Sequence, residues 1–197
     1  MTAGRPIAYE PDAALAAVMH AFWQRGYEGT SLADLLAATG LSKSSFYQAF
    51  GSKQAAFEQA LAHYCDTLVA ELRVKLRTAD SGLAFIEAVL RGAAEEAVRC
   101  AEPRGCMIVN VATEFSARDP RIRKAIAENV RRVTQVFVAA VKRAQTEGAI
   151  PAGREPRVLG RYVVSCLAGL RTLVKAGTGH RALGELIAVQ MAGLGGH

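Results

Sequence analysis

Thr30–Lys53, TSLADLLAATGLSKSSFYQAFGSK, contains two short helical patterns joined by a turn with a glycine. Ser31 and Asp34 have the spacing of a capping box, in which each residue accepts a backbone N–H of the other at the start of a helix. Gly40 suits the left-handed position that ends a helix, and Ser42 can cap a second helix over KSSFYQAF. The stretch predicts a helix-turn-helix, whose second helix has a length and polarity suited to the DNA major groove.

The composition indicates a folded protein with a sizeable core. The chain has 197 residues, of which 51% are hydrophobic, enough for one large domain or a small and a larger one. The first residues, MTAGRPIAYEPD, have no apolar segment typical of a signal peptide, and charged residues interrupt every long apolar run. We therefore expect a soluble, cytoplasmic protein that does not engage a membrane.

The cysteines and histidines give no sign of a metal site or a catalytic set. The cysteines have no CxxC spacing, the histidines are scattered, and the sequence has neither a Ser/His/Asp set nor a phosphate-binding loop. We expect reduced thiols, no cofactor, no metal and no enzymatic activity. The residues concerned are Cys65, Cys100, Cys106, Cys166, His20, His63, His180 and His197.

The positive charge is not concentrated on the helix-turn-helix. The net charge is +6, but residues 1–53 carry four cations and four anions, so the excess lies beyond Lys53. A DNA-binding hypothesis must therefore rest on where a few cations are placed and not on total charge. The balanced residues are Arg5, Arg25, Lys43, Lys53, Glu10, Asp12, Glu28 and Asp34.

Helical periodicity and helix-ending signals divide the whole chain into about nine helices, with no strand pattern and no repeat. We expect an all-α fold with a helix-turn-helix domain over residues 1–52 and a helical bundle over 53–197, connected by the helix that starts at Lys53. The later helices are expected at about 53–77, 83–100, 106–115, 120–147, 157–176 and 180–194. Residues 1–10 are expected to form a loose arm, with Arg5 available for a phosphate contact.

Two of these helices carry specific expectations about burial. The segment CMIVNVATEF is apolar nearly all round, which predicts a buried helix with Asn110 and Thr113 as polar exceptions. In the long helix from Pro120, an apolar stripe that includes Val130, Val133 and Phe137 is expected to face the core.

The motif from Thr30 to Lys53 resembles the TetR family of bacterial transcriptional regulators. The pattern S-K-x-x-F-Y-x-x-F-x-S-K leads directly into a long helix, as in that family. Ser44 and Ala49 depart from the commoner pattern, which has Gly and an aromatic residue or His there. The matching residues are Thr30, Ser31, Asp34, Gly40, Leu41, Ser42, Lys43, Tyr47, Phe50 and Lys53.

The resemblance implies a homodimer that presents two reading helices to a palindromic operator in double-stranded DNA. Phosphate contacts are expected from Tyr47 and Lys53, and from Thr30 and Ser31 at the start of the preceding helix. Base contacts are expected from the reading helix, since Lys can pair with guanine and Gln with adenine. These candidates are Lys43, Ser44, Ser45 and Gln48, the last of which could equally be a solvated side chain. The capping residue Ser42 is also expected at the DNA interface.

Cys106 is the sharpest candidate for a sensing residue. It follows Gly105 at the start of a helix beside Arg104, and both a helix N-terminus and a cation stabilise a thiolate. The segment RGCMIVNVATEF is also similar to a branch of the family in which some members sense oxidants or electrophiles through this cysteine, and Lys175 could lie near it. The alternative is a small buried hydrophobic residue, since burial raises a thiol pKa.

Further ligand candidates lie in the predicted bundle, where a small-molecule site would combine apolar walls with a few polar groups. Plain core or helix-capping roles are the alternative for each of them. The candidates are Asn110, Thr113, Glu114, Phe137, Tyr162, Ser165 and Cys166.

The last two predicted helices, 157–176 and 180–194, carry more apolar surface than one core needs. Ordinary amphipathic packing would explain this surface, and the family resemblance favours a homodimer through these helices instead. The expected function is a DNA-binding transcriptional repressor released from its palindromic operator by a small molecule, an electrophile or an oxidant, whose identity the sequence does not reveal. Two alternatives remain open at this point: an all-α enzyme or small-molecule carrier, and a thiol sensor acting through a protein partner.

Overall fold

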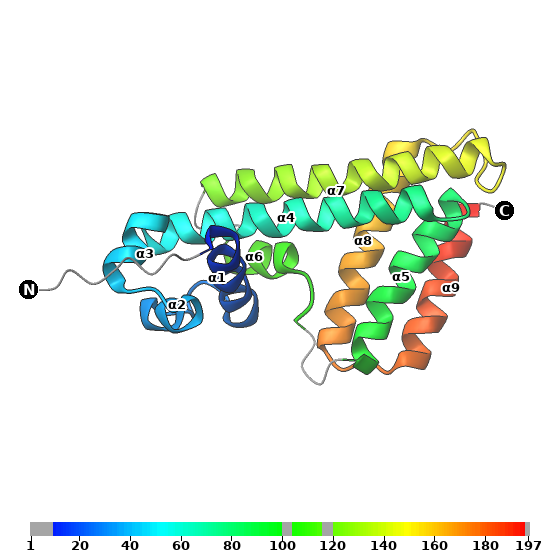
Figure 1. Ribbon diagram of the computed structural model, residues 1–197. Helices are drawn as coiled ribbons and strands as arrows, with labels where there is room; N and C mark the ends of the chain where they lie inside the picture. The colour runs from blue at the N-terminus through cyan, green and yellow to red at the C-terminus, as the bar shows by residue number, and fades with distance from the viewer. Residues whose placement is uncertain (1–9, 100–103, 116–119, 196–197) are drawn as a thin grey trace, which may run out of the picture. The chain divides into compact units, whose positions relative to one another are not determined.

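The computed structural model describes residues 10–99, 104–115 and 120–195, and this part of the chain is all-α, with nine helices and no strand (Figure 1). The chain divides into two compact units, residues 1–64 and residues 65–197. No helix among the described residues is long and apolar enough to span a bilayer. The helices are α1 Pro11–Arg25, α2 Leu32–Thr39, α3 Lys43–Phe50, α4 Lys53–Thr78, α5 Gly82–Arg99, α6 Met107–Phe115, α7 Pro120–Thr146, α8 Pro156–Lys175 and α9 His180–Gly195.

An aromatic cluster holds the first unit together. Phe22 on α1 meets Phe57 on α4 edge to face with 5.1 Å between ring centroids, and Trp23 meets Tyr64 at 4.9 Å. Such pairs combine apolar burial with a favourable ring geometry. Because the first turns of α4 pack with α1, they belong to the first unit, and the boundary between the two units falls after Tyr64, within α4.

The predicted caps and turn of the helix-turn-helix are confirmed. The Ser31 hydroxyl accepts the Asp34 backbone N–H at 3.1 Å, and the Asp34 carboxylate accepts the Ser31 N–H at 2.8 Å. Gly40 ends α2 with φ of 68°, a conformation that costs glycine little. Ser42 caps α3 by accepting the Ser45 N–H at 3.1 Å. Local signals therefore define both helices of the motif.

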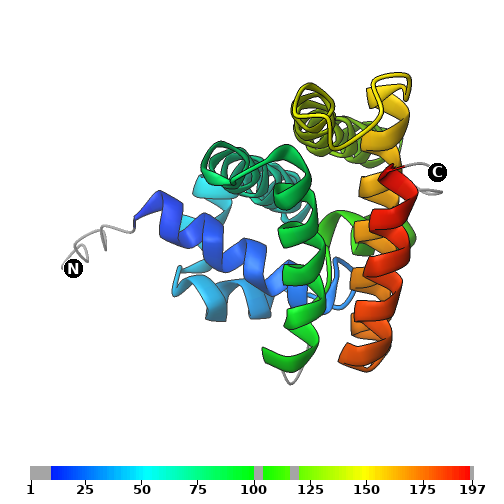
Figure 2. The ribbon, with the colours of Figure 1, turned by 90° about the vertical axis from the view of Figure 1, so that its right-hand side faces the viewer.

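In the second unit, α5, α8 and α9 lie side by side, and α7 crosses α8 (Figures 1 and 2). Gly160 allows this crossing, because a Cβ atom there would lie 2.7 Å from Val138 Cγ2 and 3.1 Å from the Val138 nitrogen. Phe137 on α7 is fully buried and packs on Phe85 of α5 with 5.7 Å between the rings. The core of this unit is thus built where α7 meets both α5 and α8.

Arg143 on α7 fastens the turn between α4 and α5. Its guanidinium donates hydrogen bonds to the carbonyl oxygens of Leu76, Ala79 and Asp80 at 2.9–3.0 Å, and it pairs with Glu147 at 2.7 Å. Glu147 in turn accepts the backbone N–H of Gly82 at 2.8 Å. One ion pair therefore provides hydrogen-bond partners both for backbone carbonyl groups at the end of α4 and for a backbone N–H at the start of α5.

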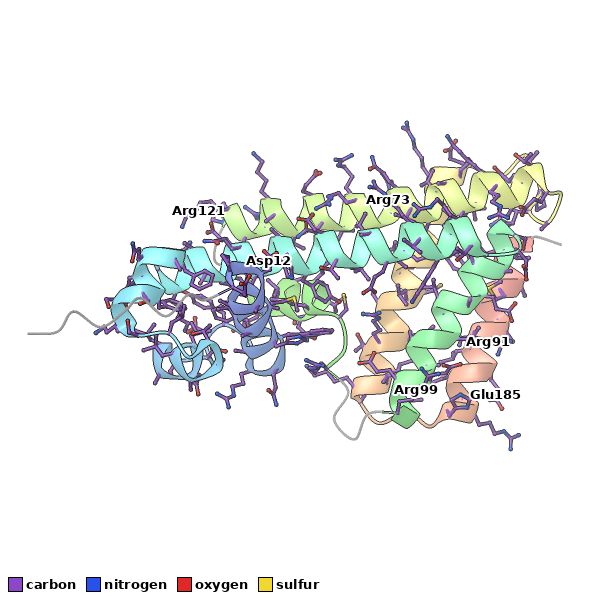
Figure 3. All side chains as sticks on the ribbon, viewed as in Figure 1. Asp12, Arg73, Arg91, Arg99, Arg121 and Glu185 are labelled. Atoms are coloured by element: carbon purple, nitrogen blue, oxygen red, sulfur yellow. The ribbon has the colours of Figure 1, made fainter. Side chains whose placement is uncertain are left out.

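Charged side chains on the outer faces of the second unit form ion pairs within single helices. Arg91 pairs with Glu87 on α5 at 2.6 Å, and Glu185 pairs with Arg181 on α9 at 3.1 Å, all four being well exposed (Figure 3). Exposed pairs of this kind contribute little to stability because water and salt screen them. These ion pairs therefore do little to hold the second unit together.

Two burial predictions are wrong. Val130 is 38% exposed, because it lies where the groove and the pocket described below open beside α7 and not where α7 packs on α5. The α6 helix is buried on one face only, through Met107, Ile108 and Val111, whereas Thr113 is exposed. The predictions for Arg5 and Cys100 lie outside the described residues.

Candidate DNA-binding and sensing sites

The exposed face of α3 follows from the burial of its two phenylalanines. Phe46 and Phe50, one turn apart, are 0% and 5% exposed and contact each other with 5.0 Å between rings. Fixing that face inward leaves Ser44, Tyr47 and Gln48 exposed on the opposite side, with Tyr47 43% exposed. The face has the size and polarity of a major-groove reading surface.

Lys43 is also exposed, at the first turn of α3, whereas the serines around it are partly engaged with one another. The Ser42 hydroxyl lies 3.0 Å from that of Ser44 and 2.8 Å from that of Ser45. Ser45 is half-buried. Lys43, Ser44, Tyr47 and Gln48 are therefore the predicted residues that α3 presents most openly.

The prediction of a DNA contact from Thr30 is corrected by its burial. Thr30 is 0% exposed, and its hydroxyl donates to the carbonyl oxygen of Gly26 at 2.6 Å. Gly26 ends α1, so Thr30 satisfies a carbonyl at that helix end and is closed to a phosphate. A threonine before a helix looks the same in sequence whether it faces the core or the solvent.

Of the other predicted phosphate contacts, Ser31 and Lys53 remain accessible, as Tyr47 does. Ser31 is exposed, although its hydroxyl and backbone N–H are used in the capping box. The Lys53 ammonium lies 4.3 Å from the centre of the Tyr27 ring, a cation–π contact that positions the cation at the first residue of α4. An ion pair between Arg25 and Asp34 joins α1 to the start of α2 in the same unit.

Cys106 lies at the start of α6 beside a small apolar pocket in the second unit. Its carbonyl oxygen accepts the Asn110 N–H at 2.9 Å, which makes Cys106 the N-cap residue. The pocket has a volume of about 60 Å³. Its wall combines residues of α4, α6, α7 and α8 with Cys106: Leu68, Ile108, Val109, Val130, Val133, Val164, Leu167, Ala168 and Arg171.

Cys106 differs from the other described thiols in its accessibility. Cys65 and Cys166 are buried, and burial raises the pKa of both thiols. Cys106 is partly exposed. Because the thiolate is the reactive form, Cys106 is the described cysteine most open to reaction with a small molecule.

The C-terminal part of α8 approaches the loop that carries Cys106, as expected for Lys175. A Cβ atom at Gly105 would lie 3.7 Å from the Lys175 Cδ atom and 3.8 Å from the Arg171 carbonyl oxygen. Arg171 also lines the pocket. Two cationic residues of α8, Arg171 and Lys175, thus lie near the loop that carries Cys106.

The remaining candidates do not line the pocket with Cys106. Phe137 is corrected to a core residue, because it is fully buried against Phe85. The Tyr162 hydroxyl donates to the Gln190 carbonyl oxygen at 3.1 Å, which joins α8 to α9, and Cys166 is buried. The other four candidates lie on α6 and α8. On α6, the Asn110 side chain donates to the Arg104 carbonyl oxygen, the Thr113 hydroxyl donates to the Asn110 carbonyl oxygen, and Glu114 is half-buried. On α8, the Ser165 hydroxyl donates to the Tyr162 carbonyl oxygen.

Sequence reasoning missed Arg171 as a residue of the Cys106 pocket. Val164, Ala168 and Arg171 follow one another at helical spacing on one face of α8, a pattern that is visible in the sequence. Which helix that face would meet is a tertiary property, because α6 and α8 are separated by all of α7.

Comparison with known proteins matches both parts of the chain to one group. Residues 14–60 match the description "Bacterial regulatory proteins, tetR family", and residues 82–188 match "Tetracyclin repressor-like, C-terminal domain". The chain is similar to the HTH-type transcriptional repressor ComR of Escherichia coli K12, with 30% identity over 184 residues, covering 88% of this chain and 83% of that protein. It is 31% identical over 168 residues to the transcriptional regulator AcuR of Cereibacter sphaeroides, covering 79% and 74%.

Solved structures give the same result. A cysteine-substituted variant of the TetR family transcriptional regulator CifR, complexed with 26-bp double-strand operator DNA, has a TM-score of 0.82 and 30% identity, covering 97% of this chain and 100% of that one. The reduced form of NemR from Escherichia coli has a TM-score of 0.81 at 21% identity, covering 91% and 94%, and shows the shared fold.

Proposed function

Because the chain belongs to the TetR family of bacterial regulatory proteins, we propose that it is a cytoplasmic repressor that binds a palindromic operator as a homodimer. The exposed face of α3, with Ser44, Tyr47 and Gln48 turned away from buried Phe46 and Phe50, is the observation that carries this proposal. Lys43, Ser44 and Gln48 read base edges, while Tyr47 and Lys53 contact phosphates and set the register. The similar CifR structure, which holds operator DNA, supports the assignment.

Exposed apolar side chains on α8 and α9 support the dimer. Val158 and Leu173 on α8 are 59% and 37% exposed, and Leu186 and Val189 on α9 are 38% and 70% exposed. A twofold contact would cover both helices of each chain and spread two reading helices over two half-sites. A single-chain mass by light scattering at micromolar concentration, with or without operator, would contradict the dimer.

The signal that releases DNA acts at Cys106. The pocket of about 60 Å³ beside this thiol is far smaller than the ~300–1,000 Å³ typical of drug-sized ligands. A small electrophile that reacts with the thiol fits this space better than a large ligand that binds without reaction. The Sγ atom forms a bond to the electrophilic carbon, the leaving group departs, and the thiol proton passes to water.

Binding to DNA from upstream of the gene that encodes the chain tests the DNA-binding proposal. Fluorescence anisotropy should show specific affinity that falls steeply as salt rises, since phosphate contacts release counterions. Absence of binding at every salt concentration would instead favour an all-α small-molecule-binding protein or a thiol sensor with a protein partner.

Iodoacetamide tests the role of Cys106 on the protein–DNA complex. Alkylation should release wild-type protein from DNA, with loss of iodide from the reagent, and should leave the Cys106→Ser complex intact. Cys166→Ser is the matched control, because Cys166 is buried and its replacement should leave the wild-type response. Equal release of wild type and Cys106→Ser would overturn the sensor assignment while leaving DNA binding untouched.

A further inference from the structure

A second depression in the second unit differs from the Cys106 pocket in both size and charge. It is a groove of about 620 Å³ between α7 and α8, and four of its nine lining residues are cationic while none is acidic. The cations are Arg131 and Lys142 of α7 and Arg157 and Arg161 of α8. A groove of this volume lies within the range of small-molecule sites, about 300–1,000 Å³.

Local geometry brings the cations of the two helices together. Arg157 and Arg161 are one turn apart, so they extend from the same face of α8. Between them lies Gly160, whose missing side chain lets α8 approach α7 closely at Val138. Both arginines therefore line the same groove as Lys142, although the loop between the two helices separates them in sequence.

Most of this positive charge is not neutralised within the described part of the chain. Arg131 pairs with Glu128 through two hydrogen bonds of 2.5 Å and 2.8 Å. Over residues 10–99, 104–115 and 120–195, no carboxylate forms an ion pair with Lys142, Arg157 or Arg161. Glu155 accepts the Arg157 backbone N–H at 3.1 Å as the N-cap of α8, so the helix terminus is already capped and the positive charge of the groove comes from its side chains.

We propose that this α7–α8 groove binds a small organic polyanion that carries phosphate or carboxylate groups. Guanidinium groups match both oxyanions with paired hydrogen bonds, so Arg157 and Arg161 would grip one anionic group. Lys142 and the amide of Gln135 supply further donors along α7. The site takes a charged metabolite, in contrast to the uncharged reactive molecule that suits the apolar pocket at Cys106.

The groove is distinct from the pocket beside Cys106. It shares only Val130 with the Cys106 pocket. On α8, Arg157 and Arg161 border exposed Val158, which belongs to the proposed dimer face. The polyanion site goes beyond the proposed function, and its test needs no DNA.

Isothermal titration calorimetry with inorganic pyrophosphate, and separately with citrate, tests the proposal on the full chain. Saturable binding of one anion per chain is expected for at least one probe, and which probe binds identifies the preferred oxyanion. The R157Q/R161Q double variant should bind at least tenfold more weakly. The matched control is R123Q/K124Q, which removes the same charge from exposed positions of α7 outside the groove.

Thermal unfolding checks that the variants are folded and gives an independent readout. All three proteins should melt at similar temperatures without a probe, and the probe should raise the melting temperature of wild type and control only. If R157Q/R161Q is unstable, the single variant K142Q should show a several-fold weaker affinity. Absence of saturable binding by both anions, or equal weakening in both double variants, would overturn the site.

Discussion

At the scale of single residues, helix capping and side-chain exposure decide what the helix-turn-helix can do. Thr30 and Ser31 are neighbours in the sequence, yet one hydroxyl is buried against Gly26 and the other caps α2 at the surface. The same contrast separates Phe46 from Tyr47 on α3. Neighbouring residues therefore divide between holding the motif and facing the solvent, where the proposed DNA contacts lie.

The two kinds of DNA contact should respond differently to substitution. Tyr47→Phe removes the proposed hydrogen bond to a phosphate, so affinity should fall about fivefold for every DNA sequence, as expected for about 1 kcal/mol. Lys43→Ala should instead reduce discrimination between operators by about 1–3 kcal/mol at the base it reads. Anisotropy titrations on the operator and on single-base variants measure both. A changed site preference in Tyr47→Phe would contradict these roles.

The capping box should make the stability of the first unit depend on pH. Hydrogen bonds from the Ser31 hydroxyl, then from its backbone N–H, with Arg25 nearby, lower the pKa of Asp34 below its ordinary value. The unfolded chain then binds this proton at a higher pH than the folded chain, so the stabilisation is present above about pH 4 and is lost as pH falls through the lowered pKa.

Ser31→Ala should cost about 1 kcal/mol at neutral pH, as for other lost N-caps. Asp34→Asn should flatten the acid side of the stability profile, because the titrating carboxylate is gone. Urea unfolding between pH 2 and pH 7, followed by Trp23 fluorescence, measures both effects. An unchanged acid slope in Asp34→Asn would show that another group is responsible.

At the scale of helices, close approach sets which elements can pack. Gly160 has no Cβ, and this absence lets α8 cross α7 next to Val138. The same crossing places Arg157 and Arg161 on the edge of the α7–α8 groove. One small residue therefore fixes both the packing and the position of a charged surface.

Adding one methyl group at this crossing should be destabilising. Gly160→Ala places a Cβ atom 2.7 Å from a Val138 methyl group, which should cost about 1–3 kcal/mol through forced side-chain and backbone shifts. Gly92→Ala on α5 is the matched control, because nothing lies within 4 Å of its Cβ position and alanine should stabilise the helix by about 0.5–1 kcal/mol. Chemical unfolding of both variants measures the difference, and equal effects would show that the crossing adapts.

The sequence predicts where the helices begin and end better than it predicts which helices pack against each other. Caps at Ser31 and Ser42 and the glycine at position 40 are local signals, and the structure confirms the helices that they delimit. Burial of Val130 was mispredicted, because an apolar stripe does not reveal where a neighbouring helix diverges. The groove at Arg157 and the approach of Arg171 to the Cys106 pocket likewise depend on pairings between distant helices.

At the scale of the whole molecule, the two units differ in the range of their contacts along the chain. The first unit closes over a shorter span of the chain, with Phe22 of α1 against Phe57 of α4, 35 residues later. The second depends on contacts between distant segments, of which the Arg143 hydrogen bonds to Leu76, Ala79 and Asp80 are the clearest example. The units should therefore differ in how strongly they respond to loss of a single distant contact.

Arg143→Ala should destabilise the second unit by about 2 kcal/mol, since it removes charge-assisted hydrogen bonds to three carbonyl groups and leaves Glu147 unpaired. Lys142→Ala, at the exposed neighbouring position, should change stability by less than about 0.5 kcal/mol. Hydrogen exchange of α4 and α5 amides should localise the effect. Equal protection in both variants would show that Arg143 is dispensable.

The Arg143 bonds also imply an order of events during synthesis. Their partners lie 63 to 67 residues earlier in the chain, so the end of α4 cannot be fastened until most of α7 has left the ribosome. Residues up to Tyr64, which make up the first unit, have by then all been synthesised. Nascent chains halted before α7 should carry a protease-resistant first unit and a cleavable α4–α5 turn, and chains halted after α8 should resist cleavage at both places. The DNA-reading part of the protein would thus fold before the part that controls it.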